Sequence, residues 1–233
     1  MHQILSDGLT ALQIPFSEEK FARFRTYYEM LTEKNAVMNL TAIKGEEDTA
    51  RLHFLDCAGL LTAYDFSGRS VVDVGTGAGF PGIPLKSLQP DVDLTLLDSH
   101  GKRMAFVADV CETLGFSDVH CVCERAEDVC SDIGGSFDVA VSRAVARLNI
   151  LCELCLPFVH VGGVFIAMKG PDCADELKEA GHAIQVLGGG APELKTYTIP
   201  GTDITHSIVM IPKLSPSPEL YPRPFGKIKK APL

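Results

Sequence analysis

Four glycines follow a short hydrophobic run near the middle of the first half of the chain. Residues 71–74 read Val-Val-Asp-Val, and Gly75, Gly77, Gly79 and Gly82 follow directly. Glycine accepts positive φ angles and lets the main chain approach a ligand without a Cβ collision. A strand that runs into such a loop presents bare backbone to a nucleoside-type cofactor in open α/β sheets. The sequence therefore predicts a cofactor loop here.

Two patterns compete for this loop. Gly77-Ala-Gly79-Phe-Pro-Gly82 satisfies the G-x-G-x-x-G pattern of dinucleotide-binding proteins, which points to an NAD-dependent dehydrogenase. Asp73-Val-Gly75-Thr-Gly77-Ala-Gly79 instead resembles the cofactor loop of S-adenosylmethionine-dependent methyltransferases. The first glycine should close the strand, and Gly75 does so, whereas the dinucleotide pattern begins two residues later. The loop favours a methyltransferase, and the dehydrogenase remains the alternative.

Other polar residues follow the ends of later predicted strands. Asp98 comes directly after the apolar run 94–97, where a carboxylate can accept hydrogen bonds from ribose hydroxyls. Ala126 and Glu127 follow the next strand, where they can meet the edge of an adenine ring. Arg143 ends the apolar run 137–141. Ligands of open α/β sheets lie beyond the carboxyl ends of the strands, so these residues are candidates for the site.

The elements that must position these residues alternate in type. We expect strands at 70–74, 94–97, 119–123, 137–142 and 163–168, and helices at 82–87, 102–114, 149–158 and 172–182. This alternation indicates a mostly parallel, doubly wound sheet. Strands at 196–199 and 207–211 should close it in antiparallel fashion. Residues 1–66 look helical, with Ser17 as the N-cap of one helix and Glu46 at the start of a second, which carries Leu52, Leu55 and Leu60 toward the core.

The composition excludes several classes of protein. No apolar run is long enough to span a membrane, and residues 1–7 do not form a targeting leader, so we expect a cytoplasmic protein. The eight cysteines lack the paired spacing of a metal site, so free and mostly buried thiols, with no bound metal, are expected. Nothing in the sequence demands more than a monomer.

Charge is unevenly distributed along the chain. The net charge of −9 argues against a general nucleic-acid-binding protein. Residues 213–233, however, hold five lysines or arginines against one acid, Glu219, and also five prolines. We expect this tail to be extended and poorly packed, and it is either a clamp on an RNA backbone or a solubilising segment.

The residues at the end of the fourth predicted strand indicate which kind of atom is methylated. Methyltransferases that act on exocyclic amines of adenine usually carry an Asn/Asp-Pro-Pro-aromatic motif there, whereas this chain has Ser142-Arg143-Ala144. A nucleophile with a free lone pair, such as N7 of guanine, needs no base to remove a proton. Positioning would then account for most of the catalysis.

Over nearly its whole length the chain resembles the family of ribosomal RNA small subunit methyltransferase G, also called the glucose-inhibited division protein B family. The resemblance rests on the runs Asn39-Leu-Thr-Ala-Ile43, His53-Phe-Leu-Asp56-Cys57, Asp73 to Leu85, Leu97 to Arg103, Ser142-Arg143-Ala144 and Met168-Lys169-Gly170. The exit of the glycine loop, Phe80-Pro-Gly-Ile-Pro84, and the run Asp98-Ser-His-Gly-Lys-Arg103 are specific to this family, whereas the glycines alone are not.

The resemblance implies a class I Rossmann-like methyltransferase with an N-terminal helical cap, which methylates N7 of a guanine in 16S rRNA of the small ribosomal subunit. We divide the chain into a cap (1–66), a methyltransferase domain (67–212) and a basic tail (213–233). A small-molecule methyltransferase and a non-catalytic S-adenosylmethionine- or nucleotide-binding module are the alternatives. The substrate would be either naked 16S rRNA or the assembled subunit.

The resemblance also implies roles for individual residues. Those expected at the cofactor are Gly75, Gly77, Gly79, Phe80, Asp98, Ala126, Glu127 and Arg143. Those expected to be catalytic are Arg143, Asn39 and His53. Those expected to contact the substrate are Arg51, Lys102, Arg103, Arg125 and Lys169. Each has a structural alternative: Asn39 could cap a turn, and His53 and Asp56 could pair with each other on one helix face.

Overall fold

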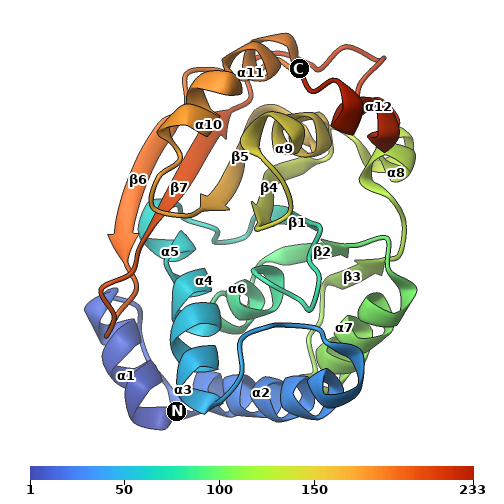
Figure 1. Cartoon of the computed structure of the whole chain (residues 1–233). Coiled ribbons are helices and arrows are strands. Elements are labelled where there is room, and N and C mark those ends of the chain that lie inside the picture. Colours follow the sequence, from blue (N-terminus) through green and yellow to red (C-terminus); the bar gives the residue numbers. More distant parts are fainter.

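A seven-stranded sheet forms the centre of the molecule in the computed structural model, which describes all 233 residues (Figure 1). The strand order is β3-β2-β1-β4-β5-β7-β6. The first five strands pair in parallel, and β7 pairs antiparallel with both β5 and β6. The strands are β1 (Ser70–Val74), β2 (Asp93–Leu97), β3 (Val119–Val122), β4 (Phe137–Arg143), β5 (Val159–Lys169), β6 (Glu193–Thr198) and β7 (Thr205–Pro212).

Helices cover both faces of this sheet. Those before and between the first three strands are α1 (His2–Ala11), α2 (Glu18–Met38), α3 (Glu46–Thr49), η1 (Ala50–Leu55), α4 (Asp56–Ala58), α5 (Leu60–Ala63), α6 (Gly82–Leu88) and α7 (Gly101–Thr113). Those that follow β3 are α8 (Ala126–Ile133), α9 (Leu148–Cys155), η2 (Leu156–Phe158), α10 (Ala174–Glu179), α11 (Gly181–Val186) and α12 (Phe225–Lys230).

The sheet separates two hydrophobic cores, because side chains along each strand point alternately to its two faces. In β1, Val71 belongs to a core of 35 buried residues that includes the N-terminal helices, α6 and α7. Its neighbour Val72 belongs to a core of 25 buried residues shared with α8, α9, α11 and α12. Successive side chains of a strand point to opposite faces, so a continuous apolar strand serves both cores.

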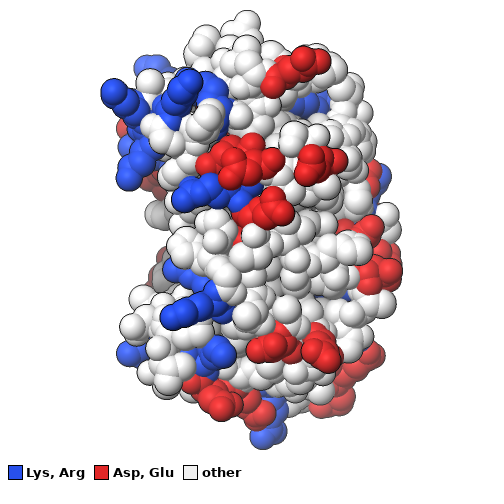
Figure 2. All heavy atoms as spheres, turned by 90° about the vertical axis from the view of Figure 1, so that its right-hand side faces the viewer, with Lys and Arg blue, Asp and Glu red and all other residues white.

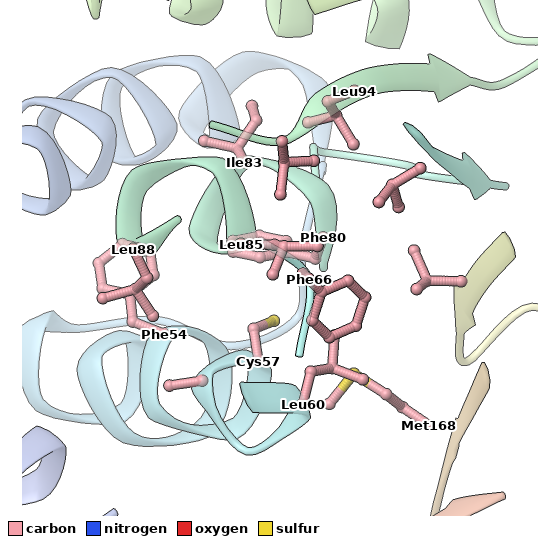
Figure 3. Close-up of a cluster of buried hydrophobic side chains, with 14 of the residues drawn as sticks. Phe54, Cys57, Leu60, Phe66, Phe80, Ile83, Leu85, Leu88, Leu94 and Met168 are labelled. Carbon is pink, nitrogen blue, oxygen red and sulfur yellow. The ribbon is translucent and has the colours of Figure 1, made fainter. Parts of the chain in front are cut away.

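The N-terminal helices pack on the sheet through apolar side chains close to the glycine loop. Figure 3 shows Phe54 and Cys57 facing Leu85 and Phe80, which come from α6 and the loop before it. Phe24 of α2 also packs on Phe54, with ring centroids 4.7 Å apart. Movement of the cap against the glycine loop would therefore expose a shared apolar cluster.

The second predicted helix begins at Glu46 as expected, but its middle is π-helical. Residues Ala50–Leu55 form the wider η1 turn, and ordinary helix resumes at Asp56. Single π turns inside α-helices occur frequently at functional sites. This turn carries His53 into the site described below.

The strands and helices expected from the sequence are confirmed, with ends that differ by a few residues. Ser17 caps α2 by accepting a hydrogen bond from the backbone N–H of Lys20 at 3.2 Å. β5 begins four residues earlier than expected, at Val159. Neither α1 nor α8 was among the individually predicted helices. The division of the chain at residues 66 and 212 stays a prediction.

The prediction of an extended, poorly packed tail is wrong. Residues 225–230 form α12, and its Ile228 is fully buried in the second core. Lys213 at the start of the tail is also buried, with its ammonium group donating hydrogen bonds to the carbonyls of Leu156 and Leu187 at 3.0 and 2.7 Å. The prolines shape a segment that packs back on the domain.

No helix combines the length and the apolar character needed to cross a membrane. All eight cysteines are free thiols, and only Cys121 and Cys123, on and next to β3, are exposed. No group of His, Cys, Asp or Glu side chains has an arrangement that could hold a metal ion.

Candidate cofactor and methyl-transfer site

A cavity of about 940 Å³ lies beyond the carboxyl ends of β1, β2, β3 and β4. The predicted site residues that line it are His53, Gly75, Gly77, Phe80, Asp98, Arg103, Arg125, Ala126, Glu127 and Arg143. Residues from the whole length of the chain thus converge on the edge of the sheet where open α/β sheets bind ligands.

The glycine loop forms the floor of the cavity. Gly75 and Gly77 have φ angles of +76° and +61°, which non-glycine residues rarely adopt. A Cβ on Gly75 would also lie 2.6 Å from the side chain of Val145. The backbone N–H groups of Gly75 and Thr76 donate to the carbonyl of Leu97, at 2.8 and 3.1 Å, and this anchors the loop to β2.

A buried carboxylate beneath the loop fixes its curvature. Asp73 Oδ2 accepts hydrogen bonds from Thr76 Oγ1 at 2.7 Å and from the N–H of Gly82 at 2.8 Å. Burial raises the pKa of Asp73 to about 7 despite these two bonds. Tyr27 of α2 donates its hydroxyl hydrogen to the carbonyl of Ala78 at 2.7 Å, so the cap also holds the loop.

Asp98 lies at the end of β2 beside the loop. Its Oδ2 accepts the N–H of Gly77 at 3.0 Å, and its Oδ1 accepts the N–H of His100 at 2.9 Å and contacts the ring nitrogen Nδ1 of that residue at 2.8 Å. Each carboxylate oxygen has more than one acceptor site. Asp98 can therefore still accept ribose hydroxyl hydrogen bonds, while it also ties the glycine loop to the start of α7.

Arg143 joins the end of β4 to the cap. Its Nη1 donates to Asp56 Oδ2 at 2.9 Å and to the carbonyl of Leu52 at 3.4 Å. Its Nη2 lies 2.8 Å from His53 Nδ1, and its guanidinium carbon lies 4.9 Å from the centre of the Phe80 ring. Only 14% of the side chain is exposed. Of its five N–H donors, two have no protein partner and remain available to a ligand.

His53 is held as a neutral ring. Burial, followed by the nearby positive charge of Arg143, lowers the pKa of His53 to about 3. Because Nδ1 faces an arginine, which can only donate, the proton must reside on Nε2, which lies 2.9 Å from Thr41 Oγ1. The ring also stacks on Phe80, with centroids 4.1 Å apart and planes inclined by 9°. The structural alternative for His53, a direct pair with Asp56, is not formed, because Arg143 binds both of them.

The closing strands supply two further partners to Asp56. Its Oδ1 accepts the hydroxyl hydrogen of Tyr197 at 2.6 Å and contacts His206 Nδ1 at 2.7 Å. The carboxylate is only 2% exposed, and the donors of His206 and Arg143 outweigh burial and lower its pKa. The sequence contained no motif around Tyr197 or His206 that could have revealed this network.

The opposite wall of the cavity starts at α8. Ala126 and Glu127 form its first turn, and Arg125 lies just before it, with Nη1 3.8 Å from Glu127 Oε1. Glu127 Oε1 also accepts the backbone N–H of Phe225 at 3.2 Å. Phe225 of α12 and Leu154 of α9 complete this wall, and neither was predicted.

The remaining predicted residues do not line the cavity. Asn39 ends α2 in the left-handed conformation, in agreement with its structural alternative. Gly79 faces the cap, since a Cβ there would meet Ile83 and the Tyr27 hydroxyl. Arg51 donates to Glu47 and to the carbonyl of Pro200.

Two lysines from the predicted set also lie outside the lining. Lys169 donates to the carbonyl of Ala146 at 3.0 Å and pairs with Glu176 at 2.7 Å, so it supports the loop after β4. Lys102 is exposed on the first turn of α7, next to Arg103, which does line the cavity.

The cavity suits S-adenosylmethionine in size and in chemistry. Its volume lies within the range of sites for ligands of this size. The space beside Gly75 would be taken up by any Cβ at that position, so the loop leaves room for a ligand. Asp98 offers acceptors for ribose hydroxyls, and Phe80 and Leu97 offer apolar surface. When bound, the cofactor supplies an electrophilic methyl group on a sulfonium.

Comparison with known proteins agrees with this geometry. A family model described as rRNA small subunit methyltransferase G matches residues 20–203. A ribosomal RNA small subunit methyltransferase G from Alkaliphilus metalliredigens is 45% identical over 233 residues, which cover 99% of this chain and 98% of the relative. The protein of the same name from Clostridium perfringens strain 13 is 40% identical with the same coverage.

Solved structures show the same fold at low sequence identity. A 16S rRNA (adenine(1408)-N(1))-methyltransferase from Catenulisporales acidiphilia gives a TM-score of 0.55 at 15% identity, and the match covers 65% of this chain and 88% of that one. TYW2 from M. jannaschii, in complex with AdoMet, gives 0.52 at 12% identity and covers 85% and 77%. These likenesses establish a Rossmann-like methyltransferase fold.

The network around Asp56 predicts a pH-dependent contribution to stability. The hydrogen bond to Asp56 raises the pKa of His206 above 6.5, while burial and Arg143 oppose this. The resulting stabilisation is complete below the unfolded pKa and is lost as pH rises through the raised folded pKa. The free energy of unfolding of the wild type should therefore exceed that of His206→Gln more at about pH 6 than at about pH 9.

Urea unfolding at the two pH values measures this difference. His182→Gln is the control, because His182 is exposed on α11 and lies outside the network of Asp56. An equal difference between wild type and His206→Gln at both pH values would contradict the prediction.

Proposed function

The chain belongs to the family of rRNA small subunit methyltransferase G, and we propose that it transfers the methyl group of S-adenosylmethionine to N7 of a guanine in 16S rRNA. The observation that carries this proposal is the cavity in which the glycine loop, Asp98 and Arg143 meet. In the proposed complex, Gly75, Gly77 and Asp98 hold the nucleoside part of the cofactor.

A nucleophile that needs no deprotonation fits the chemistry next to Arg143. N7 of guanine has a free lone pair, whereas an exocyclic amine must lose a proton. His53, the nearest ring to Arg143, is neutral and its Nδ1 already accepts from Arg143, so it is not placed to act as a base. Catalysis then depends on holding the nucleophile in line with the sulfonium methyl.

Arg143 is suited to hold an acceptor rather than to move a proton. Burial alone would lower the pKa of Arg143, but its surroundings, which include the ion pair with Asp56, outweigh burial and raise it, so Arg143 stays charged. Its two unpartnered N–H donors can bind a carboxylate or a carbonyl oxygen. Phe80 limits its movement from the other side. We propose that Arg143 anchors either the methionine carboxylate or the guanine, while His53 positions it.

Basic side chains around the cavity fit an RNA backbone. Figure 2 shows Lys and Arg side chains above and below a hollow at the left-hand edge of the face it presents. Arg103 and Arg125 line the cavity, and Lys102 lies beside Arg103. The exposed lysines of α12 are Lys227, Lys229 and Lys230. Clustered cations of this kind bind phosphates although the whole chain is acidic.

The roles proposed for the other residues follow from where they lie. Lys102, Arg103 and Arg125 contact RNA phosphates in this proposal. Asn39, Arg51, Gly79 and Lys169 support the structure around the site, since none of them lines the cavity. We propose a monomer that acts in the cytoplasm on naked rRNA or on the assembled subunit.

Labelled S-adenosylmethionine, incubated with the protein and unmodified 16S rRNA or small subunits, tests the function. We expect label in rRNA and, after mass mapping, one guanine methylated at N7. Label only in small metabolites would support a small-molecule methyltransferase instead. Cofactor binding without any transfer would support a binding module, and binding of NADH in place of S-adenosylhomocysteine would support a dehydrogenase.

Substitution of Arg143 should separate catalysis from folding. Arg143→Lys keeps a positive charge beside Asp56 but cannot bind Asp56, Leu52 and His53 together. We expect methyl transfer to fall at least about tenfold while the protein still folds, as measured by initial rates and circular dichroism. Arg147→Lys, at an exposed arginine that pairs with Glu179, is the matched control. Near wild-type activity of Arg143→Lys would remove Arg143 from the site.

Removal of the three lysine charges of α12 should weaken RNA binding without changing the affinity for the cofactor. In the triple variant Lys227→Ala, Lys229→Ala, Lys230→Ala, loss of three phosphate contacts should make the slope of log K against log salt less negative by about 2. Cofactor affinity should not change, since none of the three side chains lines the cavity. Lys195→Ala on β6, at the other edge of the sheet from β3, is the control. An unchanged salt slope in the triple variant would refute the contact.

A further inference from the structure

Phe225 reaches the cofactor cavity from the segment that follows the methyltransferase sheet. It is the first residue of α12 and lines the cavity together with Glu127 and Leu154. Its side chain is half-buried and packs on the second hydrophobic core. Figure 1 shows α12 next to α8 and α9.

A buried ion pair fixes this segment to α9. Glu153 is fully buried, and Arg223 donates to it three times: its backbone N–H at 2.9 Å, Nε at 2.7 Å and Nη2 at 2.6 Å. Arg223 Nη2 also donates to the carbonyl of Ala231 at 3.1 Å, which closes the segment around α12. A bidentate pair with a buried carboxylate is strong and has one geometry.

Two more contacts hold α12 in place. Ile228, one turn beyond Phe225, is fully buried in the second core. The backbone N–H of Phe225 donates to Glu127 Oε1, and the Glu127 side chain is only 8% exposed. Phe225 therefore has a fixed position on the wall that begins at α8, and it also determines where the Glu127 carboxylate lies.

We infer that residues 221–230, here called the C-terminal strap, are part of the cofactor site. Phe225 supplies an aromatic wall for the adenine ring, and its N–H group orients Glu127 for the edge of that ring. An apolar aromatic surface suits a purine, because every base has a π-face on which an aromatic ring can stack. This inference rests on the proposed function and adds to it a residue that contacts adenine.

The lysines of the strap and Phe225 have separate tasks in this scheme. Lys227, Lys229 and Lys230 are exposed, whereas Phe225 lines the cavity. The strap thus contacts RNA with one side and the cofactor with the other. Substitutions within a single short helix can distinguish the two tasks.

Calorimetry tests the inference with two ligands that share adenosine. S-adenosylhomocysteine contains the amino acid part as well, and 5′-methylthioadenosine lacks it. We expect Phe225→Ala to raise the Kd of both ligands about tenfold, as for loss of one base-stacking contact. Phe225→Tyr keeps the ring and should stay within about twofold of wild type. Leu220→Ala, at an exposed apolar residue just before the strap, is the matched control and should not change either Kd.

A second variant perturbs the strap without touching the cavity. Glu153→Gln keeps the volume of the side chain but weakens the anchor of Arg223, so it should raise both Kd values in the same direction as Phe225→Ala. Melting temperatures of all variants check that the domain is folded.

Each outcome addresses a single claim. Wild-type Kd values in folded Phe225→Ala would overturn the inference and leave the proposed function intact. A higher Kd for S-adenosylhomocysteine with an unchanged Kd for 5′-methylthioadenosine would also overturn the inference, since adenine would then not be the group that Phe225 contacts. Unchanged ligand affinity with weakened RNA binding would assign Phe225 to RNA. If the wild type bound neither ligand, the proposed function itself would fail.

Discussion

The buried pair of Arg143 and Asp56 is the interaction on which the rest of the site depends. Each charge would cost several kcal/mol if it were buried alone, and each is compensated by partners from another part of the chain. The cap provides Asp56 and His53, β4 provides Arg143, and the closing strands provide Tyr197 and His206. Removal of any one partner leaves a buried charge under-compensated. The network therefore fixes the cap, the parallel strands and the antiparallel strands relative to one another, at the point where the methyl acceptor is expected.

The same constraint extends to the glycine loop through Phe80. Its ring lies against both His53 and Arg143, and the loop that carries it is held from below by Asp73 and from the side by Tyr27. Asp73 and Tyr27, which do not line the cavity, therefore pre-organise the loop. Such pre-organisation suits a reaction in which the protein contributes position and electrostatic surroundings more than proton transfer.

The sequence was sufficient to predict the order of strands and helices and most of the cavity, because strand periodicity, glycines and residues at strand ends are local signals. Gly75, Asp98, Glu127 and Arg143 were found in this way. Local signals could not show that Arg143 separates His53 from Asp56, since the π-helical turn and the approach of β6 and β7 are tertiary effects. The tail was mispredicted for a related reason: its prolines and lysines indicate an extended chain, whereas its packing depends on Glu153, seventy residues earlier in the chain.

The dependence of Glu153 on Arg223 has a consequence for the order in which the protein matures. Protein chains are synthesised from the N-terminus and begin to fold during synthesis. Every hydrogen bond that Glu153 accepts comes from Arg223, so while the ribosome has yet to add that residue, the carboxylate on α9 has no cation and favours contact with water. The Glu153 carboxylate can be buried as an ion pair only once the strap has packed on α9. Assembly of this face of the protein is thus a late event in its biosynthesis, although the residues that form most of it are made much earlier.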